Sequence, residues 1–229
     1  MGRKYPSWGE KIWEDKIKTQ GEIGVVSGVN GSLSNLRKRT SSTLRFMEEN
    51  VFSKIAPNSK ILDLGVGPMA RLAIPIAKKG FKVTGVDISN TTLDLALKHS
   101  EKDGAKIKLL KEDVISLNSL KGNFDFIYCI EIFEHIPKHL SLVSLIRIKN
   151  LLGKDGFFLL EFSVECGKTL KSELFKLFYF LGHRIKSLFK KTFPVTCYSY
   201  TIDEINDLTR RVGLKIIERQ KGLFLFKKI

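Results

Sequence analysis

Short apolar runs and longer amphipathic stretches take turns along the chain after residue 58. The apolar runs favour strands at residues 60–64, 82–88, 106–110, 124–130 and 156–162. The stretches between them have the apolar spacing of helices, at residues 69–79, 90–102 and 138–151. Strands that alternate with helices in this way predict an α/β fold with a Rossmann-like, doubly wound and mostly parallel sheet.

The C-terminal part predicts an antiparallel end to this sheet. Thr201 with Glu204 three residues later has the pattern of a capping box, and Gly213 is typical of a helix end. Two further apolar segments follow at residues 214–219 and 223–228, separated by the tripeptide Gln-Lys-Gly. These segments predict a C-terminal antiparallel hairpin, which makes the expected sheet seven-stranded.

The first 57 residues are expected to form a helical N-terminal extension that is rich in basic residues. It contains a break of Gly, Ser and Asn at residues 27–35, and the sequence predicts a helix at residues 40–55. The remaining residues, 58–229, are expected to form one domain. The chain of 229 residues is long enough for such a domain with a proper core.

The composition predicts a protein of the cytoplasm. No run approaches the roughly 20 apolar residues of a membrane span. The beginning of the sequence lacks the apolar region of a secretory signal, so we do not expect secretion. Cys129, Cys166 and Cys197 lie far apart without CxxC spacing, which is typical of buried or idle thiols in a reducing compartment.

A glycine turn follows the first predicted strand. Gly65 and Gly67 allow a tight turn and close approach of backbone N–H groups to a ligand. The segment GVGPMA matches the pattern G-x-G-x-x-A, and Asp87 ends the second predicted strand 20 residues after Gly67. A carboxylate there can accept both hydroxyls of a ribose, which suits NAD and S-adenosylmethionine equally. The alternative is a turn that serves packing alone, with a capping aspartate.

Three features favour S-adenosylmethionine over NAD. Asp63 lies inside the first strand, where a buried carboxylate could reach the ammonium of an amino-acid tail. Asp113 follows the third strand and could accept a hydrogen bond from an adenine amino group. The third feature is the closing hairpin, which replaces a sixth parallel strand.

These motifs together resemble those of class I S-adenosylmethionine-dependent methyltransferases. The resemblance rests on ILDLGVGPMA, VTGVDIS, KEDV, FDFIYCIEIFEHI, LLGKDGFFLLEF and the segment YTIDEINDLTRRVGLKIIE, and it covers residues 58–229. The sequence departs from the family pattern at Met69, where a third glycine is usual, and at residues 154–156, where Lys-Asp-Gly replaces Pro-Gly-Gly. The resemblance implies that the glycine turn holds S-adenosylmethionine.

The segment after the fourth strand carries candidate catalytic residues for the methyl acceptor. Glu131, Glu134 and His135 have E-x-x-E-H spacing and would share one face if the segment were helical. Two carboxylates and an imidazole suit a divalent metal such as Mg²⁺. Alternatively, His135 is a general base for a hydroxyl acceptor, or it only packs against the strand end.

The E-x-x-E-H cluster resembles that of the ubiquinone-biosynthesis type of O-methyltransferase, in which it lies beside the acceptor and can bind metal. It is also similar to the cluster of small-RNA 2′-O-methyltransferases, which bind magnesium. The resemblance to the quinone enzymes implies that Arg45, 18 residues before Asp63, contacts the cofactor. It also implies that the backbone of Ile130 lies against the adenosine.

One segment carries a large share of the net charge of +15. Residues 168–191 contain seven Lys or Arg and one Glu, which gives +6 of this charge. The surrounding insertion, residues 167–193, has apolar residues at helical spacing with lysines largely on the other side. Such a basic amphipathic helix suits an anionic membrane surface. A lid packed on its own domain and a nucleic-acid contact are the alternatives.

We therefore expect an S-adenosylmethionine-dependent enzyme that O-methylates a lipophilic, quinone-like small molecule near a membrane surface. An RNA 2′-O-methyltransferase is the alternative enzyme, which the lack of an RNA-binding module disfavours. A domain that binds S-adenosylmethionine without catalysis is the third hypothesis, and the intact E-x-x-E-H cluster argues against it. The sequence identifies neither the acceptor atom nor the oligomeric state.

Overall fold

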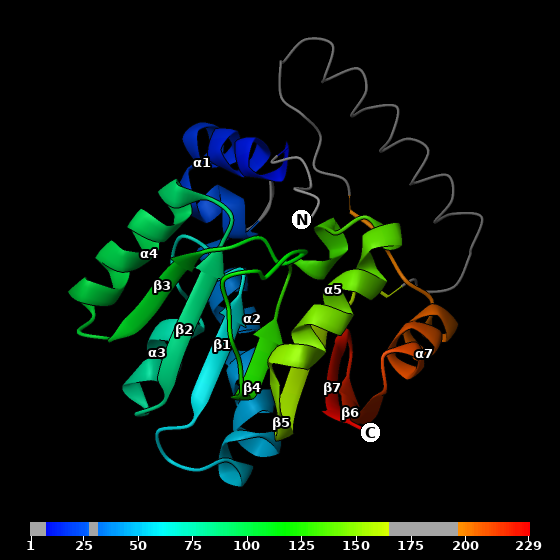
Figure 1. Ribbon diagram of the computed structural model, residues 1–229. Coiled ribbons are helices and arrows are strands. Elements are labelled where there is room, and N and C mark those ends of the chain that lie inside the picture. Colours follow the sequence, from blue (N-terminus) through cyan, green and yellow to red (C-terminus); the bar gives the residue numbers. More distant parts are fainter. Residues whose placement is uncertain (1–7, 28–31, 165–196) are drawn as a thin grey trace, which may run out of the picture.

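The computed structural model describes residues 8–27, 32–164 and 197–229 and contains the predicted seven-stranded sheet (Figure 1). Its strands are β1 (Lys60–Leu64), β2 (Lys82–Asp87), β3 (Ile107–Lys111), β4 (Phe124–Cys129), β5 (Leu152–Glu161), β6 (Leu214–Gln220) and β7 (Leu223–Lys228). They lie in the order β3-β2-β1-β4-β5-β7-β6. The strands β1 to β5 pair in parallel, and β7 is antiparallel to both β5 and β6. The predicted doubly wound sheet with a C-terminal hairpin is confirmed.

The helices are α1 (Trp8–Ser27), α2 (Leu33–Asn50), α3 (Ala73–Lys78), α4 (Asn90–Lys102), α5 (Lys138–Leu151) and α7 (Ile202–Arg211). Two short 3₁₀ helices, η1 (Phe52–Lys54) and η2 (Phe133–His135), precede β1 and α5. The bounds of α4 and α5 are those predicted, and α7 has the predicted capping box of Thr201 and Glu204. The helix predicted at residues 40–55 instead begins at Leu33, because Ser32 accepts a hydrogen bond from the Asn35 N–H as its N-cap.

Alternating side chains of each central strand enter two hydrophobic cores, one on each face of the sheet. In β4, Ile127 belongs to the core that packs against α5 and α7, whereas Phe126 and Tyr128 belong to the core that packs against α2, α3 and α4. Figure 1 shows α5 on one face of the sheet and α2 on the other. Because Phe46 and Met47 of α2 are buried in the second core, this part of the N-terminal extension packs as a layer of the domain.

The strand β5 is longer than predicted. The sequence predicts it at residues 156–162, but it begins at Leu152 and includes the Lys-Asp-Gly tripeptide. The pairing with β4 shifts between Phe124 and Phe126, so the extra residues are taken up by an irregularity at the start of the strand. The end of β5, which borders the candidate site, is regular.

The helix α1 lies across the carboxyl ends of β2 and β3 (Figure 1). The Glu14 carboxylate accepts hydrogen bonds from the Ser89 hydroxyl and the Thr91 N–H at the start of α4. The Lys111 ammonium at the end of β3 donates to the Glu10 carboxylate. The amphipathic insertion predicted at residues 167–193 lies outside the described residues. Among the helices that the structure describes, none has the length and apolar character needed to cross a membrane.

Candidate functional site

The glycine turn between β1 and α3 has the backbone that the sequence predicts. Gly65 (φ 83°) and Gly67 (φ 66°) both adopt left-handed conformations, which residues other than glycine rarely adopt. A Cβ atom on Gly65 would lie 2.3 Å from the Ile132 side chain, so this glycine is required by packing. At Gly67 no atom of the described residues lies within 4 Å of an added Cβ. The turn is therefore tightly packed at its first glycine and open at its second.

Asp87 lies beside the open end of this turn, as predicted. One carboxylate oxygen accepts from the Gly67 N–H at 3.3 Å and the other from the Ser89 N–H at 3.1 Å. Burial raises the pKa of Asp87 to about 6, although these hydrogen bonds lower it. A carboxylate has about four lone-pair sites, so Asp87 keeps acceptor capacity for the hydroxyls of a ribose.

Asp63 is buried in β1, as predicted. It is only 4% exposed, and its carboxyl group accepts a hydrogen bond from the Tyr128 hydroxyl at 2.8 Å. Burial raises the pKa of Asp63 to about 7, while Tyr128 and Arg71 lower it. The residue therefore supplies a buried acidic group from β1, anchored by β4.

The other predicted cofactor residues occupy three different settings. Asp113 lies two residues after β3 and accepts a hydrogen bond from the Ile115 N–H at 2.8 Å, while burial raises its pKa. Ile130 is buried directly after β4. Arg45, in contrast, is exposed on α2. Asp113 and Ile130 thus lie at strand ends, whereas Arg45 lies on the outside of a helix.

The open space at Gly67 and the half-buried carboxylate of Asp87 fit the ribose of a nucleoside cofactor. Both lie at the carboxyl ends of neighbouring parallel strands, where ligands of doubly wound folds bind. The arrangement favours a ligand that needs close backbone approach and a hydroxyl acceptor.

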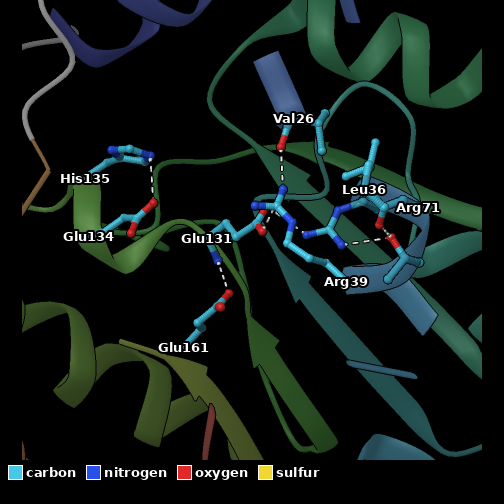
Figure 2. A network of polar contacts seen from close by, with 9 residues as sticks. Val26, Leu36, Arg39, Arg71, Glu131, Glu134, His135 and Glu161 are labelled. Carbon is cyan, nitrogen blue, oxygen red and sulfur yellow. Dashed lines mark hydrogen bonds and ion pairs between the residues drawn. The ribbon is translucent and has the colours of Figure 1, made fainter. Parts of the chain in front are cut away.

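The E-x-x-E-H segment does not form the α-helix considered in the sequence. Glu131 has a left-handed backbone (φ 60°), and the 3₁₀ helix η2 begins only at Phe133. Figure 2 shows the Glu131 side chain turned toward Arg39 and Arg71, with Glu134 and His135 on its other side. The cluster is therefore divided, and Glu131 does not share one face with the other two residues.

Glu134 and His135 lie close to Cys197, which is distant from them in the sequence. The His135 Nε2 atom lies 3.6 Å from a Glu134 carboxylate oxygen (Figure 2), and its Nδ1 atom lies 3.7 Å from the Cys197 Sγ atom. The Tyr198 N–H donates to the Glu134 carbonyl at 2.7 Å, which fixes this segment beside η2. Ligand atoms of Glu134, His135 and Cys197 lie within 4.8 Å of one another.

The helix α1 covers this group with an aromatic ring and a cation. The rings of Trp13 and His135 meet edge to face with centroids 5.1 Å apart, and the Lys16 ammonium lies 4.6 Å from the Trp13 ring centroid. Burial lowers the pKa of Lys16, and burial raises the pKa values of Glu134 and Cys197. Lys16, Glu134 and His135 are half-buried, whereas Cys197 is exposed, so the group is only partly covered.

Several residues of this site carry no signal in the local sequence: Trp13, Lys16, Arg39, Glu161 and Cys197. They come from α1, α2, the end of β5 and the segment before α7, and only the fold brings them to the end of β4. Arg71 is different, because it follows the glycine turn within four residues. A search for cations next to that turn could have found it.

Comparison with known proteins shows what the chain is similar to. Residues 61–156 match the family of methyltransferase domains. The chain is 37% identical over 118 residues to the ubiquinone biosynthesis O-methyltransferase of Actinobacillus pleuropneumoniae serotype 7 (strain AP76), covering 49% of this chain and 48% of that protein. The protein of the same name from Coxiella burnetii (strain Dugway 5J108-111) is 32% identical over 107 residues, covering 47% and 44%. The alignment thus spans slightly less than half the length of these curated relatives.

Solved structures share the fold over nearly the whole chain. The magnesium protoporphyrin IX methyltransferase of Synechocystis PCC 6803 with bound SAH has a TM-score of 0.65 at 19% identity, covering 94% of this chain and 97% of that chain. The PH0226 protein of Pyrococcus horikoshii OT3 has a TM-score of 0.66 at 17% identity, covering 94% and 99%. At such identities the likeness concerns the fold.

Proposed function

We propose that this chain, which carries a class I S-adenosylmethionine-dependent methyltransferase domain, methylates a hydroxyl oxygen of a lipophilic, quinone-like small molecule. The observation that carries the proposal is an imidazole beside a carboxylate at the carboxyl end of β4, one strand from the glycine turn. The curated relatives named ubiquinone biosynthesis O-methyltransferase support the substrate class.

In this proposal the cofactor lies along the carboxyl ends of β1 to β3. Gly67 gives the close backbone approach, Asp87 accepts from the ribose hydroxyls, and Asp113 lies where an adenine amino group would donate. The contact of Asp63 with the ammonium of the amino-acid tail remains a proposal, as do the contacts of Ile130 and Arg45 that the resemblance implies. When bound, S-adenosylmethionine supplies an electrophilic methyl group.

The residues on the acceptor side prepare the hydroxyl oxygen of the acceptor to receive the methyl group. His135 takes the proton of the acceptor hydroxyl, and Glu134 at 3.6 Å stabilises the imidazolium ion that results. Trp13 gives an apolar wall against which an aromatic acceptor can lie. Because methyl transfer depends mainly on positioning, α1 has a direct part in the proposal through the contact of Trp13 with His135.

The residues present do not fit the magnesium site considered in the sequence. The Glu131 carboxylate is held by two arginines, and the group that does converge contains one carboxylate, one imidazole and one thiol. Mg²⁺ requires oxygen ligands in near-octahedral geometry. The proposed reaction therefore has no step that uses Mg²⁺.

The test is a transfer assay with S-adenosylmethionine and catechols that carry alkyl tails of increasing length. We expect a product heavier by one methyl group, detected by mass spectrometry, and a KM that falls as the tail lengthens. Methylation of oligoribonucleotides instead of catechols would establish the RNA alternative, which the net charge of +15 favours. Methylation of neither, together with tight binding of S-adenosylhomocysteine, would support a domain that has lost catalysis.

The proposed membrane contact rests on residues 168–191 and has its own test. We expect the protein to sediment with anionic vesicles at low salt and to ignore neutral ones. Replacing Lys186, Lys190 and Lys191 by Ser should release it, and so should replacing Leu181 and Ile185 by Ser, because apolar burial contributes the other part of the binding. Wild-type protein that stays in the supernatant would contradict the contact.

A further inference from the structure

Glu131 adopts a conformation that a glutamate ordinarily avoids. Its φ of 60° lies in the left-handed region, where Gly, Asn and Asp are the common residues. Such a conformation persists only where the surrounding structure enforces it. The side chain and the N–H of Glu131 are therefore the places to look for what holds the turn.

Three side chains hold Glu131 (Figure 2). Arg39 Nη2 lies 3.0 Å from one carboxylate oxygen and Arg71 Nη2 lies 2.9 Å from the other. The Glu131 N–H donates to the Glu161 carboxylate at 3.1 Å. Each oxygen of the Glu131 carboxylate thus pairs with one arginine, and the backbone N–H has Glu161 as a third partner.

The two arginines are themselves fixed by other elements. The second terminal nitrogen of Arg71 donates to the Thr40 hydroxyl at 3.0 Å, and Arg39 donates to the Val26 carbonyl at 2.9 Å. Arg71 is the better shielded of the pair, since its side chain is 13% exposed against 48% for Arg39. The Glu131 carboxylate, at the end of β4, therefore connects to α1 and α2 through Arg39 and to the loop after β1 through Arg71. The Glu131 backbone N–H connects the same residue to the end of β5.

The turn at Glu131 contacts both halves of the site. Ile132, the next residue, packs so closely on Gly65 that a Cβ there would lie 2.3 Å from it. His135 follows three residues later at the end of η2. A change in the direction of the chain at Glu131 would move Ile132 against the glycine turn and His135 against the acceptor at the same time.

We propose that Arg39, Arg71 and Glu161 are positioning residues that hold Glu131 in its left-handed turn and thereby set the separation between the glycine turn and His135. Glu131 is then a positioning residue as well, and the base is His135. This inference rests on the proposed function. It assigns the three partners a role in transfer even though they do not contact His135 in the network shown.

The kinetic test is a double-mutant cycle on the arginine that is better shielded. Arg71→Met and Glu131→Gln should each lower kcat about 10²-fold, the effect of a misplacement near 1 Å, and change the Kd for S-adenosylhomocysteine less than threefold. The double variant should be no slower than the slower single variant, because both changes release the same turn. Arg71→Lys should recover part of the rate, and Arg37→Met, an exposed position on α2, should match the wild type.

The same variants allow a test without substrate. The His135 ring resonances of the free protein, assigned with His135→Gln, should shift in Arg71→Met and Glu131→Gln but not in Arg37→Met. Unmoved resonances, or rate losses that multiply in the double variant, would overturn the inference. Shifted resonances in a protein that methylates no catechol would leave the positioning intact and contradict the proposed function instead.

Discussion

The two ends of the candidate site are built in different ways. On the proposed cofactor side, Gly65, Gly67 and Asp87 offer a turn of defined backbone conformation and a carboxylate at strand ends. On the acceptor side, η2 gathers side chains from α1, α2, β5 and the segment before α7. A site made of backbone is encoded locally, whereas a site made of side chains depends on the whole fold.

This difference explains what the sequence predicts well. The glycine turn, the aspartate 20 residues later and the capping box of α7 each depend on residues close together in the chain, and the structure has all three. The order of the strands follows from the alternation of apolar runs with helices. Such features need no knowledge of distant contacts.

The acceptor side shows what local patterns leave out. E-x-x-E-H spacing predicts a shared face only if the segment is helical, but the left-handed backbone of Glu131 sends that side chain toward Arg39 and Arg71. Cys197 reaches His135 across 62 residues of sequence. Neither the conformation nor the contact follows from the spacing of the motif.

The largest expected effect separates the two sides by chemistry. His135→Gln should lower turnover about 10²–10⁴-fold, because it removes the proposed base, and should leave the Kd for S-adenosylhomocysteine nearly unchanged. Steady-state kinetics and calorimetry measure the two quantities. His139→Gln, an exposed position at the start of α5, is the control. A His135→Gln variant that loses cofactor affinity as much as turnover would contradict the assignment of His135 to the acceptor side alone.

The next effect distinguishes the two glycines of the turn. Gly65→Ala should lower the free energy of unfolding by about 2–5 kcal/mol, because it adds overpacking against Ile132 to backbone strain. Gly67→Ala should cost only the strain, about 1–3 kcal/mol, but should weaken S-adenosylhomocysteine binding at least about tenfold, which is about 1.4 kcal/mol, since its methyl group fills the open space.

Gly104→Ala is the matched control for Gly67, because Gly104 has φ 64° and an equally open surrounding among the described residues. Urea denaturation and calorimetry on the three variants separate packing from ligand approach. If Gly67→Ala binds S-adenosylhomocysteine as tightly as Gly104→Ala does, the open space is not where the cofactor lies.

The smallest expected effect is a pH dependence confined to the cofactor side. Burial raises the pKa of Asp87 to about 6, and the ionised carboxylate is the form that accepts ribose hydroxyls. Affinity for S-adenosylhomocysteine should therefore be about tenfold weaker at pH 5 than at pH 7, since each pH unit below the pKa costs about 1.4 kcal/mol. Calorimetry in two buffers at pH 6 should show proton release on binding.

The stability of the free protein should change with pH in the opposite direction to its affinity for S-adenosylhomocysteine. An unfolded aspartate loses its proton near pH 4, whereas folded Asp87 holds its proton until about pH 6. Between these values the folded state binds more protons, so the free energy of unfolding of the free protein should fall as pH rises through that window. Asp87→Asn should remove this contribution and reduce the dependence of affinity on pH, whereas Asp94→Asn, exposed on α4, should keep both. Wild-type affinity that is flat from pH 5 to pH 7 would show that Asp87 does not contact the ribose, and the proposed role of this carboxylate would be wrong.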